Sequence, residues 1–364
     1  DFILEDLKKA TEMLPASYGS REKGRATKGA AYALKSRVEL YDKRYEDVIK
    51  SCAEVYKLGY ELVDGTTPEK YRSIWWTTNK DNKEIIFDVQ YKSPDVYNNM
   101  MVCNMVTYIN DKYGDRGWGG LGPTQELIDA FEMADGTPAT QYSQAPADQV
   151  FDINTCGIYE GREPRFYANI VFHGSQIFFN ADKGAVTVDR YLMDTPDKGD
   201  GSLTGYNVWK WIDYDNYNYP YAGAGSPDFS TNWIILRYAE IYLNDAEARL
   251  ETGDVEGARK AVNMIRQRVG LPDLTESDPE KLRELIRKER RIEFAFEEQR
   301  FYDVRRWKIG PETQTTLHGV RFVSPTEFKV TKTDIRTWND RLYLTPVPHD
   351  EIVRSSVLKQ NPGY

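Results

Sequence analysis

Two segments that lie far apart in the chain have the spacing of paired helices. The first runs from Arg25 to Leu58 and holds two helical stripes, Lys28 to Leu40 and Tyr45 to Leu58, joined by a polar turn. The second runs from Arg237 to about Gly270 and turns at Thr252 to Asp254. Each unit is close to 34 residues long, which is the period of tetratricopeptide-type repeats. Such helix pairs bury their faces by stacking on neighbours, so further helices must complete the array.

Other segments of the chain supply those further helices. Ser277 to Glu280 has a capping side chain and a first-turn proline, and it predicts a helix that continues over Leu282 to Phe296. A short helix is expected at about Phe301 to Trp307, and another over Asp1 to Leu14. In the segments Asp1 to Leu14 and Lys28 to Leu40, the spacing predicts an inward-facing apolar stripe. Its residues are Ile3, Leu7, Ala10, Leu14, Ala31, Leu34 and Val38.

The chain changes character between the two hairpins, at roughly residues 60 to 232. Short runs such as Glu84 to Tyr91 and Arg165 to Phe172 predict β-strands, and clusters of Gly, Pro, Asn and Asp separate them. Trp75 and Trp76 would point to opposite faces of an extended segment, and we expect core packing there. The aromatic run from Trp209 to Tyr221 fits a second binding surface and internal packing equally well. Long insertions of this kind are usually functional.

Charge and cysteine content exclude several classes of protein. The net charge of -9 argues against nucleic-acid binding, which needs a concentrated basic surface. The three cysteines are widely spaced and form no CxxC pair, so we expect free, buried thiols rather than a zinc or redox site. No stretch approaches the roughly 20 apolar residues of a membrane span. Because the chain starts at Asp1 without Met, we expect a processed or truncated product whose targeting signal lies upstream.

Several separate motifs resemble those of the SusD/RagB family, in the order in which that family carries them. The residues that carry the resemblance are Gly24–Thr27, Pro123–Leu127, Phe131–Gly136, Glu163–Tyr167, Leu236–Leu243 with Ala246–Ala248, Ile265–Arg268, Arg287–Arg306 and Gln360–Tyr364. The resemblance spans essentially the whole chain. It implies a mainly α fold, a tetratricopeptide-like scaffold with a large insert of irregular loops and short strands. We divide this single domain, 1–364, into helical-repeat parts at 1–60 and 233–310, the insert at 61–232 and a C-terminal segment at 311–364.

The resemblance also implies a function, a location and a partner. It implies a lipid-anchored lipoprotein on the outer-membrane surface of a Bacteroidetes-type bacterium. Such a protein captures oligosaccharides and delivers them to a SusC-like, TonB-dependent transporter, and it is not an enzyme. Full-length family members carry a lipidated cysteine and a helical segment before the part that corresponds to Asp1. The membrane anchor and part of the sugar-binding platform are therefore expected outside this chain.

The best candidate for a sugar-binding surface lies between residues 97 and 120, where aromatic and polar residues alternate. Sugars offer CH-rich faces that stack on aromatic rings and hydroxyls that meet polar side chains. Glycines on both sides of Trp118 leave room for a ligand at the indole face. Trp118 and Tyr97 also resemble the family's stacking aromatics by their place in the chain. The predicted ligand-binding residues are Trp118, Tyr97, Asn98, Asn99, Tyr113, Asp115 and Arg116.

Each of these features has a simpler structural interpretation. A tryptophan in a glycine-rich loop is often the plug of a local core, and Tyr97 has the same alternative. The charged residues of Arg287 to Arg306 have the i, i+3 and i+4 spacing of helix-surface ion pairs and buried structural contacts rather than of a catalytic cluster. We predict no cofactor. Acidic, carbonyl-rich loops leave calcium open as a ligand, although no EF-hand loop is present.

Two alternative functions stay open at this point. A glycoside hydrolase would need two carboxylates about 5 to 9 Å apart across a sugar cleft, and 57 acidic residues do not exclude such a pair. A peptide-binding, RagB-like uptake lipoprotein or a structural helical-repeat adaptor would use the same scaffold. The helical-repeat scaffold and the family resemblance argue against the hydrolase, and the aromatic loop favours glycan binding over the peptide-binding and adaptor alternatives.

Overall fold

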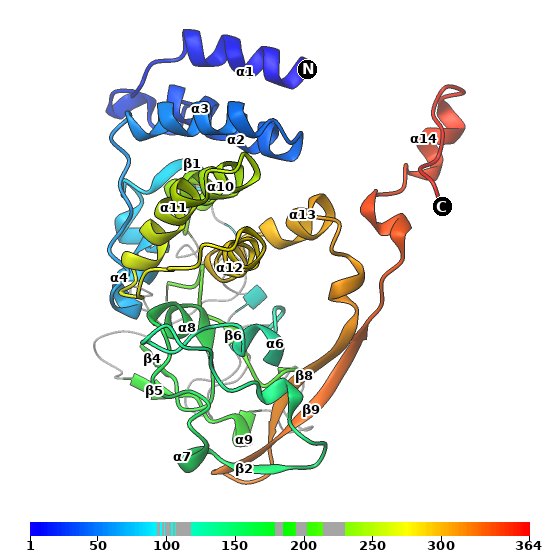
Figure 1. Cartoon of the computed structure of the whole chain (residues 1–364). Coiled ribbons are helices and arrows are strands. Elements are labelled where there is room, and N and C mark those ends of the chain that lie inside the picture. The colour runs from blue at the N-terminus through cyan, green and yellow to red at the C-terminus, as the bar shows by residue number, and fades with distance from the viewer. Residues whose placement is uncertain are drawn as a thin grey trace.

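The protein is described by a computed structural model, in which a stack of helices covers a lobe of short helices and strands (Figure 1). The residues that the structure describes are 1–92, 95, 96, 98, 103, 104, 106, 118–178, 185–193, 202–213 and 230–364. The helical stack contains these elements: α1 (Phe2–Met13), α2 (Lys28–Tyr41), α3 (Tyr45–Tyr56), α10 (Tyr238–Glu251), α11 (Val255–Gln267), α12 (Pro279–Glu293) and α13 (Gln299–Arg306). The predicted mainly α fold with an insert of short strands is confirmed by this architecture.

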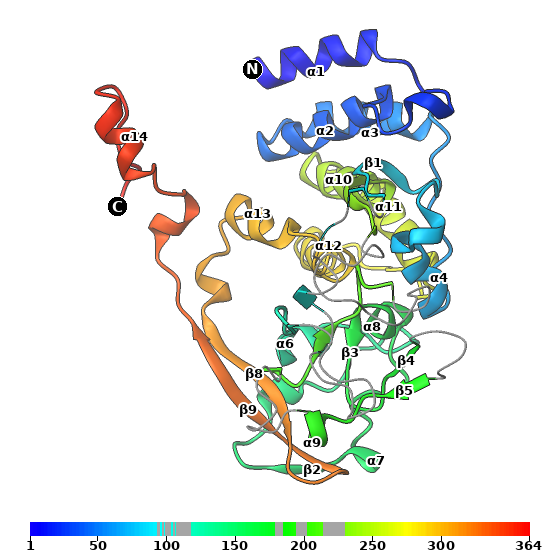
Figure 2. The same cartoon turned by 180° about the vertical axis from the view of Figure 1, so that it is seen from behind.

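Both predicted helical hairpins are present, and they pack on one another. Helices α2 and α3 form the first, α10 and α11 the second, and the two lie in successive layers below α1 (Figures 1 and 2). Capping explains where these helices start. The Thr27 hydroxyl accepts from the backbone N–H of Ala30 at 3.2 Å, and Asp254 accepts from that of Gly257 at 2.8 Å. A Cβ on Gly29 would lie 2.2 Å from the Tyr60 hydroxyl oxygen, so only glycine fits there.

Helix α12 begins at the predicted place. The Asp278 carboxylate accepts from the backbone N–H groups of Glu280 and Lys281, each at 3.0 Å, and Pro279 occupies the first turn. The helix ends at Glu293, three residues before the predicted end at Phe296. The backbone of Phe296 is left-handed, with φ of 65°, and this turn redirects the chain into α13.

A short antiparallel sheet joins the insert to the helical stack. Strand β1 (Ile85–Val89) confirms the predicted run and pairs with β7 (Trp233–Arg237), which leads directly into α10. The pairing places the start and the end of the large insert side by side. The insert therefore leaves the stack and returns to it at one point.

The lower lobe is built from short elements around an aromatic core. The helices are α4 (Pro68–Arg72), α6 (Gln125–Ile128), α7 (Ile153–Cys156), α8 (Pro164–Asn169) and α9 (Arg190–Met193). The strands are β2 (Val150–Asp152), β3 (Ile170–Val171), β4 (Gln176–Phe178), β5 (Ala185–Thr187), β6 (Asn207–Val208), β8 (Thr315–Phe322) and β9 (Glu327–Arg336). Strand β9 lies between β2 and β8 in an antiparallel sheet. Phe131, Phe166, Tyr206 and Phe328 are fully buried in the core of this lobe.

The C-terminal segment follows β9 and stands apart from the helical layers. It ends with α14 (His349–Arg354), which lies away from the rest of the molecule in both views (Figures 1 and 2). None of the residues of α14 is buried. The ribbon of β8 and β9 connects this segment to the lower lobe.

Some local predictions were wrong. The run from Arg165 to Phe172 is mostly helix α8, because Pro164 supplies a helical first turn; only Ile170 and Val171 form a strand. Trp75 ends a 3₁₀ turn instead of lying in an extended segment, although its predicted core position is confirmed. Ile3 and Leu34 face solvent, and Leu4 is the buried residue of α1 at that level.

Candidate functional site

The side chain of Trp118 is accessible to solvent. Its relative exposure is 59%. An indole exposed to this extent leaves a large apolar face available to a ligand. The alternative that Trp118 plugs a local core does not fit this exposure.

The loop that carries Trp118 is fixed from behind by backbone contacts. Gly119 has φ of +57°, a left-handed conformation that suits glycine. The backbone N–H of Gly120 donates to the carbonyl of Cys103 at 2.7 Å. A Cβ on Gly120 would lie 2.8 Å from that carbonyl oxygen, so the two backbones meet only because residue 120 has no side chain. These contacts hold the loop two residues after the exposed indole.

Helix α6 follows this loop in the chain and is fixed by buried polar contacts. Gln125 is fully buried, and its amide oxygen accepts from the Tyr206 hydroxyl at 2.7 Å. Its amide nitrogen donates to Asp129 at 2.8 Å, and Asp129 accepts in turn from the backbone N–H of Ser143 at 2.7 Å. A buried chain of satisfied polar groups of this kind is rigid. The chain is therefore held at Gly120 and again at Gln125, and both points follow Trp118.

Asn98 holds the start of the predicted surface against strand β7. Its side-chain amide donates to the backbone carbonyl of Thr231 at 2.8 Å. The next residue, Asn232, accepts from the backbone N–H of Tyr91 at 3.1 Å and donates to Asp88 at 2.6 Å. Burial raises the pKa of Asp88, although the hydrogen bond from Asn232 opposes the shift. Asn98 thus has a structural contact besides the ligand contact that the sequence predicts.

The remaining predicted binding residues lie outside the described part of the chain. They are Tyr97, Asn99, Tyr113, Asp115 and Arg116. In the sequence Tyr97 directly precedes Asn98, and the other four lie between Asn98 and Trp118, so the role assigned to them stays a prediction. Sequence reasoning missed Thr231 and Asn232, whose signal is only a polar pair directly before the strand that begins at Trp233.

The other tryptophans near this surface belong to the core. Trp75, Trp209 and Trp211 are buried, and Trp211 stacks on Trp233 with ring centroids 4.6 Å apart. The guanidinium of Arg72 lies 4.1 Å from the centroid of the Trp209 ring. For Trp209 and Trp211 the packing alternative is therefore correct, while the tyrosines that follow lie outside the described residues.

The charged segment from Arg287 to Arg306, which spans the end of α12 and all of α13, supplies a buried ion-pair network between the stack and the lower lobe. Glu293 is fully buried and contacts Arg237 at 2.6 Å and Arg165 at 3.0 Å, and it also pairs with Arg268. Burial alone would raise the pKa of Glu293, but these guanidinium groups hold it well below its usual range. Arg290 pairs with Asp303 at 2.8 Å in the same way. The predicted structural role is confirmed for Arg290, Glu293 and Asp303, which are buried and paired within the protein.

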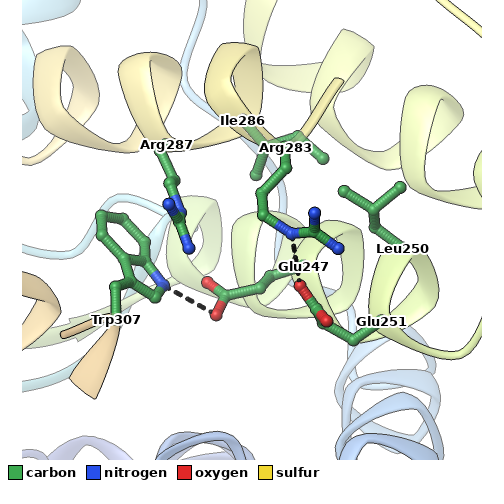
Figure 3. A pocket seen from close by; sticks show the side chains of 7 residues that line it. All are labelled: Glu247, Leu250, Glu251, Arg283, Ile286, Arg287 and Trp307. Atoms are coloured by element: carbon green, nitrogen blue, oxygen red, sulfur yellow. Dashed lines mark hydrogen bonds and ion pairs between the residues drawn. The ribbon is translucent and has the colours of Figure 1, made fainter. Parts of the chain in front are cut away.

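A shallow hollow between α10, α12 and Trp307 is also lined by charged groups (Figure 3). The empty space of about 210 Å³ around these side chains includes open solvent, so only a small part of it is enclosed by the protein. Glu247 accepts from the Trp307 indole N–H at 2.9 Å, and Arg283 donates to Glu251 at 2.8 Å. The Arg287 guanidinium lies 5.0 Å from the Trp307 ring centroid. The lining groups satisfy one another, so this hollow is weaker than Trp118 as a ligand site.

The described part of the chain has no metal-binding cluster, disulfide or membrane-spanning helix. The described residues contain no group of three or more His, Cys, Asp or Glu side chains arranged to hold a metal ion. Cys52, Cys103 and Cys156 are all free thiols; Cys52 is fully buried as predicted, whereas Cys103 and Cys156 are only partly buried. None of the helices in the described ranges is long and apolar enough to cross a membrane.

Comparison with known proteins gives one consistent family. The model of the SusD family matches residues 83–364. SusD-like protein P2 of Formosa agariphila is 38% identical over 155 residues, which are 39% of this chain and 28% of that protein. The match thus spans less than a third of the relative's length.

Two solved structures from Bacteroides fragilis NCTC 9343 resemble this chain along nearly its whole length. A SusD-like protein is 99% identical with a TM-score of 0.95, and the alignment covers 100% of this chain and 70% of that one. A SusD-like carbohydrate binding protein is 25% identical with a TM-score of 0.75, over 96% of this chain and 68% of that one.

Proposed function

The chain belongs to the SusD family, and from this membership we propose that it captures oligosaccharides by stacking a sugar ring on Trp118. Polar side chains on the same loop would meet the sugar hydroxyls and select the ligand. This mode of binding leaves the sugar chemically unchanged. The protein would therefore be a receptor rather than an enzyme.

The observation that carries this proposal is the exposed indole on a fixed loop. Trp118 is 59% exposed, and the contact between Gly120 and Cys103 holds the loop behind it. A ring that is already in place loses little conformational freedom when a sugar stacks on it. A structural neighbour described as a carbohydrate binding protein supports glycan binding in general.

The polar part of the proposed site comes from the loop residues between Asn98 and Trp118. We assign hydroxyl contacts to Asn98, Asn99, Asp115 and Arg116, because amide, carboxylate and guanidinium groups bond sugar hydroxyls in fixed directions. Tyr97 and Tyr113 would add apolar faces with polar tips. Asn98 would serve both the ligand and the Thr231 carbonyl to which it already donates.

Delivery to a SusC-like, TonB-dependent transporter at the outer-membrane surface is the second part of the proposal. It follows from family membership, and a lipid anchor upstream of this chain would hold the protein at the membrane. Co-purification of the tagged protein with its transporter from outer membranes would test this part. Recovery of the protein without any barrel-sized partner would contradict it.

The experiment that tests capture is a glycan array probed with this protein, followed by incubation of the hits and a search for new reducing ends. We expect binding to a small set of oligosaccharides and no increase in reducing ends. New reducing ends would establish a glycoside hydrolase instead. Binding to peptides on a parallel peptide array, with no glycan hits, would favour the peptide-uptake alternative.

A further inference from the structure

Asp88 is a buried carboxylate near the end of strand β1. Only 8% of the residue is exposed, and among the described residues no cation forms an ion pair with it. The ammonium group of nearby Lys80 donates to the backbone carbonyl of Tyr91 at 2.7 Å. A buried charge is costly unless hydrogen bonds satisfy it. The charge of Asp88 therefore calls for an explanation.

This carboxylate fixes the orientation of the Asn232 side chain. The Asn232 amide nitrogen donates to Asp88 at 2.6 Å, and its amide oxygen accepts from the backbone N–H of Tyr91 at 3.1 Å. Because a carboxylate only accepts and a backbone N–H only donates, one orientation of the amide satisfies both contacts. A charged acceptor also makes the first contact stronger than a hydrogen bond between neutral groups. Asp88 thus holds Asn232 in a single arrangement.

Asn232 lies where strand β7 meets the start of the predicted glycan surface. The backbone pairing of β1 and β7 ends at Trp233. Beyond that point the Asn232 side chain takes the N–H of Tyr91, and the carbonyl of the preceding residue, Thr231, accepts from the Asn98 amide at 2.8 Å. A fixed Asn232 side chain therefore also fixes the backbone that holds Asn98.

The two contacts hold a short turn on both of its sides. The backbones of Lys92 and Val96 exchange two hydrogen bonds, each 2.8 Å long, which close this turn. Tyr91 directly precedes the turn, and Asn98 follows it by two residues. One contact therefore holds the chain before the turn, and the other holds the chain after it.

We propose that Asp88 and Asn232 are positioning residues of the glycan surface, because they hold Asn98 where its side chain reaches a sugar hydroxyl. They are 8% and 5% exposed, so neither touches the ligand itself. The inference rests on the proposed function, since it assigns Asn98 to the ligand. A purely structural role of the pair would lower the stability of the protein without changing the affinity of its folded form.

Exchanging the two side chains tests the proposal. Asn232→Asp keeps the shape of the side chain but brings two carboxylates to hydrogen-bond distance, where like charges repel. Its affinity for an array-selected oligosaccharide, measured by calorimetry well below the thermal midpoint, should fall about ten-fold, within the range of couplings in one hydrogen-bond network. The double variant Asp88→Asn, Asn232→Asp restores one donor and one acceptor to the pair, so it should bind within about two-fold of the wild type.

Asn263→Asp is the matched control. Asn263 on α11, in the helical stack (Figure 1), is likewise buried, and it donates to the carbonyl of Leu274 at 3.2 Å and accepts from the N–H of Leu274 at 2.8 Å. Its replacement also sets a carboxylate against a hydrogen-bond acceptor, so it should lower the thermal midpoint while the affinity stays within about two-fold of the wild type. An equal loss of affinity in Asn263→Asp and Asn232→Asp would show that affinity merely follows stability, and would overturn the proposal.

A double-mutant cycle tests whether Asn232 acts through Asn98. In the background of Asn98→Ala, the change Asn232→Asp should weaken binding by less than about two-fold, because the side chain that it positions is already gone. The full ten-fold loss in this background would show that Asn232 acts on another part of the surface, and the assignment would be wrong.

Hydrogen exchange separates a failure of this inference from a failure of the proposed function. Without ligand, peptides that contain Tyr91 should exchange faster in Asn232→Asp than in the wild type, and the double variant should restore the wild-type rate. A wild type that binds no glycan would overturn the proposed function and with it the ligand assigned to Asn98. Glycan binding that is equal in the wild type and Asn232→Asp, or exchange that is the same in both, would overturn the positioning role alone.

Discussion

Removing the charge of Glu293 should destabilise the protein strongly. The carboxylate is fully buried and contacts Arg237 at 2.6 Å, Arg165 at 3.0 Å and Arg268. Glu293→Gln keeps the size of the side chain but leaves these cations without their shared counter-charge. Breaking a buried pair from one side costs about 3–5 kcal/mol. Since one carboxylate serves three arginines, we place the loss near the middle of this range.

The expected shift of the thermal midpoint follows from the size of the chain. An unfolding entropy of about 2.1 cal/mol/K per residue over 364 residues is about 0.76 kcal/mol/K. A loss of about 4 kcal/mol therefore corresponds to a fall of about 5 °C. The assay is differential scanning calorimetry at pH 7, with urea unfolding as an independent measure.

A control on the same helix separates this effect from any general sensitivity of α12. Glu284 is 68% exposed and pairs with Arg287 at 3.2 Å, so Glu284→Gln should change the midpoint by less than about 1 °C.

The depressed pKa of Glu293 adds a pH test. Its stabilisation is present above the usual carboxylate pKa and is lost as the pH falls through the lower folded-state pKa, so the two proteins should converge in acid. A Glu293→Gln midpoint within 1 °C of the wild type at pH 7 would refute the network argument.

Three further predictions concern individual side chains. Burial lowers the pKa of Lys210 from 10.5 to about 8 despite the nearby Glu297, so the unfolded chain binds more protons than the folded protein between these pH values. Relative to Lys210→Met, the wild type should therefore gain about 2 kcal/mol of unfolding free energy from pH 8 to pH 10. A difference in urea unfolding that stays constant or falls would contradict this prediction. Gly120→Ala places a Cβ 2.8 Å from the Cys103 carbonyl oxygen. This overpacking should lower the free energy of unfolding by about 1–3 kcal/mol and weaken glycan binding. An unchanged urea midpoint would show that the loop adapts freely. Burial raises the pKa of the Cys52 thiol well above its usual value, so iodoacetamide at pH 8 should leave Cys52 unmodified in the native protein and modify it in urea; native labelling measured by mass spectrometry would contradict its burial.

The scaffold could be predicted from the sequence because its signals are local and periodic. The hairpins over α2–α3 and α10–α11 follow from apolar spacing, and the start of α12 follows from Asp278 and Pro279. The extent to which each apolar helix residue is buried was harder to predict. Leu34 has the right spacing for the core and is nonetheless exposed, because only part of the helix faces a neighbouring layer.

Long-range contacts could not be predicted in the same way. The pairing of Glu293 with Arg165 joins residues 128 positions apart, and charge spacing within one helix carries no signal of it. The helix over Pro164–Asn169 was predicted as a strand because the apolar run resembles one, whereas the proline at its start decides the backbone. Trp118 and Trp209 are both tryptophans of the insert, and only tertiary packing makes one exposed and the other buried.

The binding energy assigned to Trp118 can be calculated from its exposure. An indole offers up to about 250 Å², of which 59% is exposed, and a stacked sugar covers about half of that remainder. At about 25 cal/mol per Å², roughly 75 Å² is worth about 2 kcal/mol, or about thirty-fold in affinity. Because the side chain is exposed, its removal should change stability by less than about 0.5 kcal/mol.

The measurement that tests the glycan-receptor account most directly is isothermal titration calorimetry of an array-selected oligosaccharide against Trp118→Ala, with Phe2→Ala as a matched control. Phe2 is an exposed aromatic residue on α1, at the far end of the molecule from α6 (Figure 1). The account predicts that Trp118→Ala remains folded and binds about thirty-fold more weakly, while Phe2→Ala binds like the wild type. Unchanged affinity in Trp118→Ala would contradict the assignment of Trp118 as the stacking residue.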